Sequence, residues 1–181
     1  MPRPKTRTDE EVLDAALLSL RYGQLTFAGV AHASGLSAAT LVQRFGNKNR
    51  LRQRALLRAW DLLDARTAEL AASAPLTPAG AIDLLVGLSG QYDEIDRYAD
   101  NLMLLREDLR DPVLRARGAA WERELIAALE ARCGAGTGAL LAAHWQGAVT
   151  WWAFRPESGL EAELRASLGR LVALLERQDG A

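Results

Sequence analysis

The sequence predicts an all-α fold, and two features of its patterning carry that prediction. No segment shows the sustained two-residue alternation of apolar and polar side chains that is typical of a strand. Several segments instead space their apolar residues three or four apart, as on one face of a helix, and glycine or proline breaks separate them. About nine helices are expected along the 181 residues, a length that allows one or two small domains.

The first and fourth predicted helices frame the N-terminal part of the chain. Thr8 and Glu11 form a capping-box pattern that starts the first helix, and Gly23 ends it. The fourth helix is long, because an apolar stripe continues from Lys48 to about Ala72. It is expected to join the N-terminal part to everything that follows.

Residues 26–48, between these two helices, predict a helix-turn-helix. Two short helical pieces, Phe27–Ala33 and Ala38–Phe45, each follow a hydroxyl side chain that can cap the first turn, and Gly35 suits the turn between them. The free face of the second piece carries small and hydrogen-bonding side chains, as a helix that enters the DNA major groove needs. The spacing alone leaves open an ordinary helical hairpin with no role in DNA binding.

Charge is distributed unevenly along the chain, although the formal net charge is only −1. Residues 1–52 hold eight basic and four acidic side chains, which leaves 14 basic and 19 acidic side chains for residues 53–181. A basic segment binds a polyanion through the release of counterions, and an acidic body discourages nucleic acid from binding elsewhere. Because the positive segment coincides with the helix-turn-helix, the charge pattern favours DNA binding.

Beyond a linker that contains Pro75 and Pro78, the chain predicts five more helices. Their expected ranges are 78–92, 93–109, 112–133, 139–154 and 160–177. A glycine-rich segment after Cys133 and a proline-containing segment after Phe154 separate the last three.

Composition indicates a soluble, cytoplasmic globular protein. Hydrophobic residues make up 49% of the chain and charged residues 25%, but no apolar run approaches the roughly 18 residues that span a bilayer. The first residues, MPRPKTRTDEE, are not followed by the apolar region of a signal peptide. The single cysteine, Cys133, permits no internal disulfide, which agrees with a reducing compartment; sensing of oxidants is the alternative role for this thiol.

The first sixty or so residues contain an ordered series of signature positions. Paired alanines in the first helix precede a glycine, a threonine-capped helix, a short turn, a helix that ends in phenylalanine, and a lysine that opens the fourth helix. The residues of this series are Ala15-Ala16, Gly23, Thr26, Ser34-Gly35-Leu36-Ser37, Thr40-Leu41, Phe45 and Lys48. In this order and spacing they resemble the DNA-binding head of the TetR family of transcriptional repressors.

The resemblance implies DNA contacts for eight residues of the head, which we define as residues 1–52. These are Thr26, Ser37, Ala38, Ala39, Thr40, Gln43, Arg44 and Lys48. Thr26 and Lys48 stand at helix N-termini and are expected to bind phosphate, and Ser37 either does the same or serves only as a cap. The alanines and Thr40 are small enough to let the helix approach the bases, and Gln43 is the best candidate for recognising a base.

The chain departs from the family pattern in the third helix. Val42 stands where a tyrosine that helps to grip a phosphate is usual, and Arg44 stands where histidine or tyrosine is usual. Arg44 is expected to replace the phosphate contact or to reach a guanine; the alternative is that it only pairs with a neighbouring acid. His32 is expected to face solvent or to lie near a phosphate, because no second metal ligand stands at helical spacing from it.

The expected domains are a DNA-binding domain, residues 1–52, and a helical ligand-binding and dimerisation domain, residues 53–181. The resemblance implies that the last two helices form a homodimer interface. The final helix supports this, since its leucine stripe is larger than a terminal helix usually leaves in water. The residues assigned to the interface are Leu141, Ala148, Trp152, Leu164, Leu168, Leu171 and Leu175.

The resemblance also implies a cavity for a small, largely apolar or aromatic effector. All five tryptophans lie outside the head, and core or interface packing is the alternative role for each of them. The candidate ligand-binding residues are Gln91, Tyr92, Met103, Arg106, Trp121, His144, Trp145 and Trp151. The acidic run after Tyr92 is expected to be a solvated helix face rather than a metal site.

Together these features predict a ligand-responsive transcriptional regulator: a repressor that binds a pseudo-palindromic operator as a homodimer and that its effector releases. No cofactor and no membrane partner are expected. The alternative is a helical ligand carrier or enzyme that does not bind DNA. A metal-dependent enzyme of that kind would need a Glu-x-x-His pair, but Gly29 and Leu141 stand three residues before the two histidines.

Overall fold

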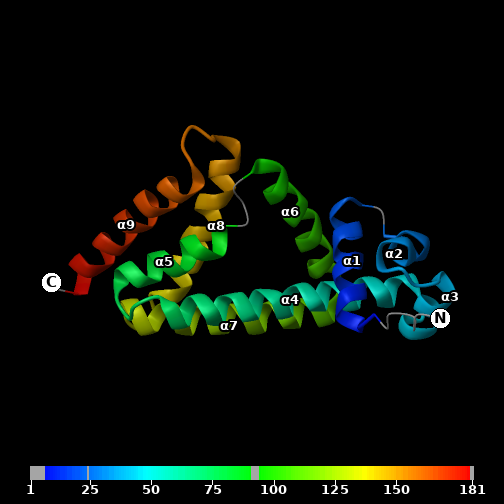
Figure 1. Ribbon diagram of the computed structural model, residues 1–181. Helices are drawn as coiled ribbons and strands as arrows, with labels where there is room; N and C mark the ends of the chain where they lie inside the picture. The colour runs from blue at the N-terminus through cyan, green and yellow to red at the C-terminus, as the bar shows by residue number, and fades with distance from the viewer. Residues whose placement is uncertain (1–6, 24, 91–93, 180–181) are drawn as a thin grey trace. The chain divides into compact units, whose positions relative to one another are not determined.

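The computed structural model of the protein describes residues 7–23, 25–90 and 94–179, and side chains as far as residue 177. Within these residues the chain forms nine α-helices and no strand, which confirms the predicted all-α fold (Figure 1). The structure consists of two compact units: residues 1–62 with 100–118 form the first unit, and residues 63–99 with 119–181 form the second. The functional boundary expected between residues 52 and 53 stays a prediction.

The helices follow the ranges expected from the sequence closely. They are α1 (Asp9–Arg21), α2 (Phe27–Ser34), α3 (Ala38–Phe45), α4 (Lys48–Ser73), α5 (Pro78–Ser89), α6 (Ile95–Arg110), α7 (Pro112–Cys133), α8 (Gly138–Phe154) and α9 (Leu160–Asp179). The helix α5 ends at Ser89, with Gly90 as its C-cap, and the last two residues of its expected range, 91 and 92, lie outside the described residues. Among the described residues no single helix is long and apolar enough to cross a membrane; α7 and α8 reach that length and apolarity only as a pair, which is bent by 111°.

The core of the first unit lies where α1, α2, α3 and the start of α4 meet (Figure 1). Its buried side chains are Val12, Leu13, Ala16, Leu25, Val30, Ala31, Leu41, Phe45, Leu51 and Ala55. The capping box predicted for α1 is confirmed: the Glu11 amide donates to the Thr8 hydroxyl at 3.2 Å, and the Thr8 amide donates to the Glu11 carboxylate at 2.9 Å. This double hydrogen bond fixes the first turn of α1 and so the direction in which its apolar face meets the other helices.

Polar side chains connect α4 with the parts of α6 and α7 that belong to the first unit. Gln53 of α4 donates to Asp111 at 2.7 Å, and the Trp60 indole N–H donates to Asp108 at 3.3 Å. Burial raises the pKa of Asp108 to about 6, and the neighbouring charges of Asp111 and Glu107 act in the same direction. At neutral pH the ionised Asp108 carboxylate therefore lowers the stability of the folded state.

Replacing Asp108 with asparagine is expected to remove a pH-dependent weakness of the first unit. The pKa of Asp108 rises from its usual 3.8 to about 6 on folding, so the folded state binds the proton more tightly than the unfolded chain. The stability that protonation of this group provides is fully present below about pH 4 and is lost as the pH rises through 6. Between pH 5 and pH 7.5 the wild type should lose about 1 kcal/mol of unfolding free energy relative to the variant. Urea unfolding of both proteins over this range measures the difference, and parallel pH profiles would contradict the prediction.

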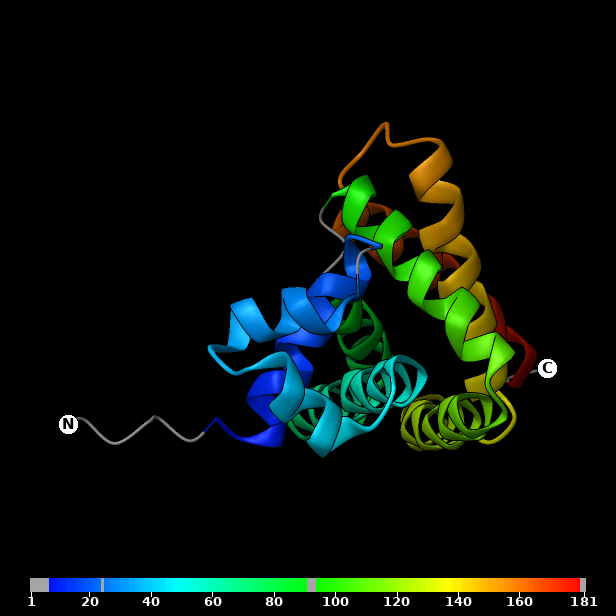
Figure 2. The ribbon, with the colours of Figure 1, turned by 90° about the vertical axis from the view of Figure 1, so that its right-hand side faces the viewer.

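The core of the second unit is built from α5, α8 and α9, and Figure 2 shows the loop that joins α8 to α9 at the top of the view. Two tryptophans complete this unit with buried hydrogen bonds. The Trp145 indole N–H donates to the Ser89 hydroxyl at 2.7 Å, and the Trp121 indole N–H donates to the Thr67 hydroxyl at 2.9 Å. Each indole thus satisfies its polar group inside the unit, as a buried tryptophan requires.

A buried arginine of α7 holds the end of α4 in the second unit. Arg132 donates to the backbone carbonyl groups of Ala71 at 2.6 Å, of Ala74 at 3.0 Å and of Ala128 at 2.7 Å. The last carbonyl groups of a helix have no partner within it, so a guanidinium there satisfies them and complements the helix dipole. The end of α4 is therefore fixed in the second unit, while its first residues belong to the core of the first unit.

Candidate nucleic-acid interface

The turn between α2 and α3 is set by local backbone chemistry. Thr26 accepts the Gly29 amide at 3.0 Å and Ser37 accepts the Thr40 amide at 3.1 Å, so both predicted N-caps are confirmed. Gly35 has a φ of 70°, in the left-handed region that glycine adopts without a steric penalty. These interactions let α3 begin only four residues after α2 ends.

The helix α3 buries one side and exposes the other. Leu41 and Phe45 are fully buried in the core of the first unit and anchor the helix. The opposite side is exposed, and we call it the recognition face; it consists of Ala38, Ala39, Val42 and Gln43. The structure therefore brings three of the predicted DNA-binding residues together on one accessible surface of small side chains.

Val42 belongs to the recognition face, although the sequence drew attention to it only as a departure from the family pattern. Its side chain is 46% exposed. The four-residue spacing between Ala38 and Val42 already placed both on one side of the helix, and an exposed methyl group there can contact a thymine methyl. Thr40 is partly buried, and its hydroxyl shares a hydrogen bond of 2.8 Å with Ser37, so it lies at the edge of the face.

Basic side chains lie at the start of α4. Asn47 caps this helix by accepting the Arg50 amide at 3.0 Å. Lys48, a predicted phosphate contact, and Arg50, which the sequence did not single out, are both exposed, and neither forms an ion pair with another described residue. Free amides at a helix N-terminus together with two cations favour a bound phosphate.

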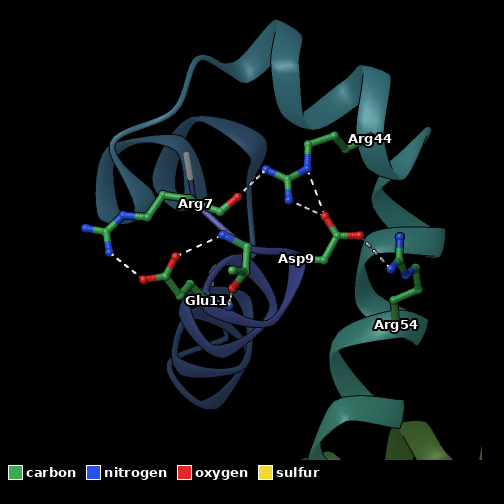
Figure 3. Close-up of polar contacts among 6 residues, drawn as sticks. Arg7, Asp9, Glu11, Arg44 and Arg54 are labelled. Atoms are coloured by element: carbon green, nitrogen blue, oxygen red, sulfur yellow. Dashed lines mark hydrogen bonds and ion pairs between the residues drawn. The ribbon is translucent and has the colours of Figure 1, made fainter. Parts of the chain in front are cut away.

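The side chain of Arg44 is directed back toward the start of α1 (Figure 3). Its Nε donates to Asp9 Oδ1 at 2.9 Å, its Nη2 contacts the same oxygen, and its Nη1 donates to the Arg7 carbonyl at 3.1 Å. Arg54 of α4 donates to the second Asp9 oxygen at 2.9 Å. The hydrogen bond from Arg44, together with that from Arg54, holds the pKa of Asp9 below its usual range. Of the two interpretations that the sequence left open for Arg44, the structure contains the ion pair with a neighbouring acid.

The same cluster connects α1, α2, α3 and α4 of the first unit. Arg7, just before α1, donates to the Ser34 carbonyl at the end of α2 at 3.2 Å. The guanidinium groups of Arg54 and Arg44 lie 4.8 Å and 5.7 Å from the centre of the Phe45 ring, within the range of a cation–π interaction. The buried ring that anchors α3 is thus covered by two cations that Asp9 holds in place.

Two of the three predicted ligand-binding tryptophans, Trp121 of α7 and Trp145 of α8, pack inside the second unit. Trp121 and Trp145 are both nearly inaccessible, and their indole N–H groups are bonded inside the second unit. These two side chains thus have the core role that the sequence left open as the alternative, and their assignment to a ligand pocket stays a prediction. Gln91 and Tyr92 lie outside the described residues.

The four remaining ligand candidates fall into two separate groups. Met103 and Arg106 are exposed on the part of α6 that belongs to the first unit. His144 and Trp151 line a surface groove of about 820 Å³ along α8 and α9, where the His144 Nε2 and the Ser167 hydroxyl are 2.8 Å apart. Only these two candidates are brought to one concave surface.

Most of the leucines assigned to a dimer interface are used inside the second unit. Leu141, Leu164 and Leu168 are fully buried, and Trp152 is nearly so, with its indole N–H donating to the Ser158 carbonyl at 2.8 Å. The sequence assigned them to an interface because the stripe of α9 is strongly apolar, but α5 and α8 of the same chain cover that stripe. These four residues are corrected from interface to core.

An apolar surface nevertheless remains on α8 and α9 outside this core. Trp151 is 60% exposed and Phe154 is 75% exposed, and their ring centres are 5.8 Å apart. Leu140 and Leu174 are also exposed. The predicted interface residues Ala148, Leu171 and Leu175 are partly buried on the same two helices. We call the exposed residues Leu140, Trp151, Phe154 and Leu174 the outer surface of α8 and α9.

Two further reactive side chains among the described residues are His32 and Cys133. His32 is exposed on α2, as expected. Burial raises the pKa of the Cys133 thiol, which disfavours the reactive thiolate that oxidant sensing would need. Among the described residues no three histidine, cysteine or carboxylate side chains gather in a way that could hold a metal ion.

Comparisons with known proteins agree with this architecture. No family model and no curated protein matches the sequence. Among solved structures, SCO7518 from Streptomyces coelicolor A3(2) has a TM-score of 0.70 at 21% identity, over 90% of this chain and 96% of that one. The multidrug binding protein EbrR complexed with malachite green has a TM-score of 0.66 at 22% identity, over 91% and 98% of the two chains. The TetR family transcriptional regulator PfmR from Thermus thermophilus has a TM-score of 0.59 at 20% identity, over 90% and 97%.

These likenesses cover about nine-tenths of the chain, so they include the helix-turn-helix and also the helices that follow it. The resemblance that the first sixty residues indicated therefore extends, at the level of the fold, to the second unit. The chain has the fold of the TetR family of transcriptional regulators.

Proposed function

We propose that this protein is a transcriptional regulator that binds double-stranded DNA through the recognition face of α3. The observation that carries the proposal is the geometry of α3, whose buried Leu41 and Phe45 anchor a helix with small side chains on its exposed side. The major groove admits an α-helix presented in this way. Exposed Lys48 and Arg50 at the start of α4 supply phosphate contacts. Structures of the same fold are described as transcriptional regulators and not as enzymes, which supports the same class.

The proposal includes a homodimer formed through the outer surface of α8 and α9. Exposed aromatic side chains such as Trp151 and Phe154 are typical of surfaces that a partner covers. A two-fold axis would place two recognition helices about 34–36 Å apart, one turn of DNA, and so select a pseudo-palindromic operator. Sedimentation at several protein concentrations checks the dimer, and a monomer at every concentration would remove this part of the proposal.

The proposal also includes release from the operator by a small, largely apolar or aromatic effector, and thus a repressor. EbrR, which shares the fold, was crystallised with malachite green. Because α4 has residues in both units, an effector that shifts its second half also shifts the helix that begins beside the recognition face. A coupling of about 1–3 kcal/mol weakens operator binding roughly 5- to 150-fold, and operator DNA must weaken effector binding equally. The cytoplasmic location stays a prediction.

Selection of bound sequences from a random duplex library tests the proposal before any operator is known. We expect an inverted repeat whose half-sites are centred about one helical turn apart. Affinity for the selected sequence should fall steeply with salt, since phosphate contacts release counterions. Absence of salt-dependent DNA binding would favour the alternative class, a helical ligand carrier or enzyme.

Replacing Gln43 with alanine is expected to weaken binding to the selected sequence by about 1–3 kcal/mol. Gln43 is exposed on the recognition face, and its amide is the side chain there that can form paired hydrogen bonds with a base. Random DNA should be bound almost as well by the variant as by the wild type, because a base contact contributes little there. Titrations of both proteins with the two DNAs measure the difference, and an equal loss on both would show that Gln43 recognises no base.

A further inference from the structure

Arg44 is the only arginine of α3, yet each of its three guanidinium nitrogens is directed to a group of the protein itself. Nε and Nη2 are directed to the Asp9 carboxylate and Nη1 to the Arg7 carbonyl (Figure 3). The side chain is only 26% exposed, although Gln43, the preceding residue, is exposed on the recognition face. A guanidinium next to a recognition face normally forms strong hydrogen bonds with a phosphate or a guanine. In this protein the guanidinium of Arg44 instead binds Asp9, a carboxylate of the same chain.

Asp9 is suited to compete with a phosphate. It stands in the first turn of α1, where the helix dipole favours a carboxylate, and its two oxygens receive Arg44 and Arg54. Both cations also lie over the Phe45 ring, so their positions depend on one another. The pKa of Asp9 is held below its usual range, and the carboxylate is therefore charged under the conditions in which DNA is bound. A DNA phosphate would therefore have to displace Asp9, which is also negatively charged, before it could bind Arg44.

We propose that Asp9 is a specificity-determining residue that withholds Arg44 from the DNA backbone and positions α3 against α1 and α4. The proposal rests on the proposed DNA-binding function. Because Arg44 adds no phosphate contact, affinity for random DNA stays low, and discrimination depends on the recognition face. Because the contacts of Arg44 with Asp9 hold α3 in place against α1, the distance between Gln43 and the bases is also fixed.

The test compares Asp9→Ala with Glu10→Ala. Glu10 is the next residue in the same helical turn; its side chain is 70% exposed and its nearest cation is Arg58, 3.7 Å away. Both variants remove one negative charge from the same end of α1, but only Asp9→Ala frees Arg44. Binding to a random duplex is measured between about 50 and 300 mM salt, conditions in which each phosphate contact adds about 0.9 to the slope of log affinity against log salt.

For Asp9→Ala we expect a slope steeper by about 0.9 than that of Glu10→Ala, and an affinity for random DNA about fivefold higher. The double variant Asp9→Ala/Arg44→Met should return to the slope of Glu10→Ala, whereas Asp9→Ala/Arg54→Met should keep the steeper slope. The ratio of affinities for selected and random DNA should fall in Asp9→Ala. Loss of a merely structural ion pair would lower the melting temperature without steepening the slope.

Three outcomes would overturn the proposal. The first is an equal slope for Asp9→Ala and Glu10→Ala, and the second is a return to the control slope with Arg54→Met instead of Arg44→Met. The third needs no change at Asp9 and so remains decisive even if Asp9→Ala fails to fold: Arg44→Met alone should keep the wild-type slope, and a shallower slope would show that Arg44 already contacts phosphate. Failure of the wild type to bind any DNA would instead refute the proposed function.

Discussion

Replacing Phe45 with alanine is expected to lower the free energy of unfolding of the first unit by about 3–5 kcal/mol. The ring is fully buried and closes the core between α1, α3 and α4, so its removal leaves a cavity that the short helix α3 cannot fill by moving. The guanidinium groups of Arg54 and Arg44 also lose the aromatic face beneath them, worth about 0.5–1 kcal/mol each at partly exposed sites. DNA binding should be lost at temperatures where the second unit is still folded.

Val42→Ala is the matched control for this prediction. It shortens an apolar side chain on the same helix, three residues earlier, but Val42 is nearly half exposed and should cost less than about 0.5 kcal/mol of stability. Guanidinium unfolding followed by circular dichroism measures both variants. A loss below about 1 kcal/mol for Phe45→Ala would show that α3 is not anchored by its buried side.

Replacing Gly80 with alanine is expected to destabilise the second unit by about 3 kcal/mol, at the upper end of what overpacking usually costs. Gly80 lies in the first turn of α5, and a methyl group there would stand 1.9 Å from the Pro75 carbonyl oxygen and 2.9 Å from its carbon. These are backbone atoms, and the same carbonyl accepts the Thr77 amide at 2.9 Å, so neither side can yield without breaking the turn that starts the helix.

Gly169→Ala serves as the control, because it is the same chemical change in the interior of a helix. Nothing lies within 4 Å of the position of its new methyl group on α9, so this variant should gain about 0.5–1 kcal/mol. Thermal unfolding of the two variants should therefore shift in opposite directions. Equal shifts would contradict the close approach of α5 to the segment before it.

The helices and the helix-turn-helix can be predicted from the amino-acid sequence without a structure. The start of α1 follows from Thr8 and Glu11, and the starts of α2 and α3 follow from Thr26 and Ser37, because a cap involves residues only three positions apart. The turn between α2 and α3 follows from a single glycine, Gly35. The buried side of α3 follows from the spacing of Leu41 and Phe45, and its exposed side is what remains. Such features depend on neighbours in the chain, so a single sequence contains them.

The partner of each polar or aromatic side chain, in contrast, is set by tertiary packing. Arg44 meets Asp9 across 35 positions, and Trp145 meets Ser89 across 56, distances in sequence over which no periodicity carries information. For the same reason an apolar stripe does not reveal what covers it. Leu164 and Leu168 had the pattern of an interface, and the packing of α5 and α8 made them core. A helical pattern predicts that one face of the helix is buried. It does not predict which segment covers that face, because the covering segment depends on how whole helices pack against one another.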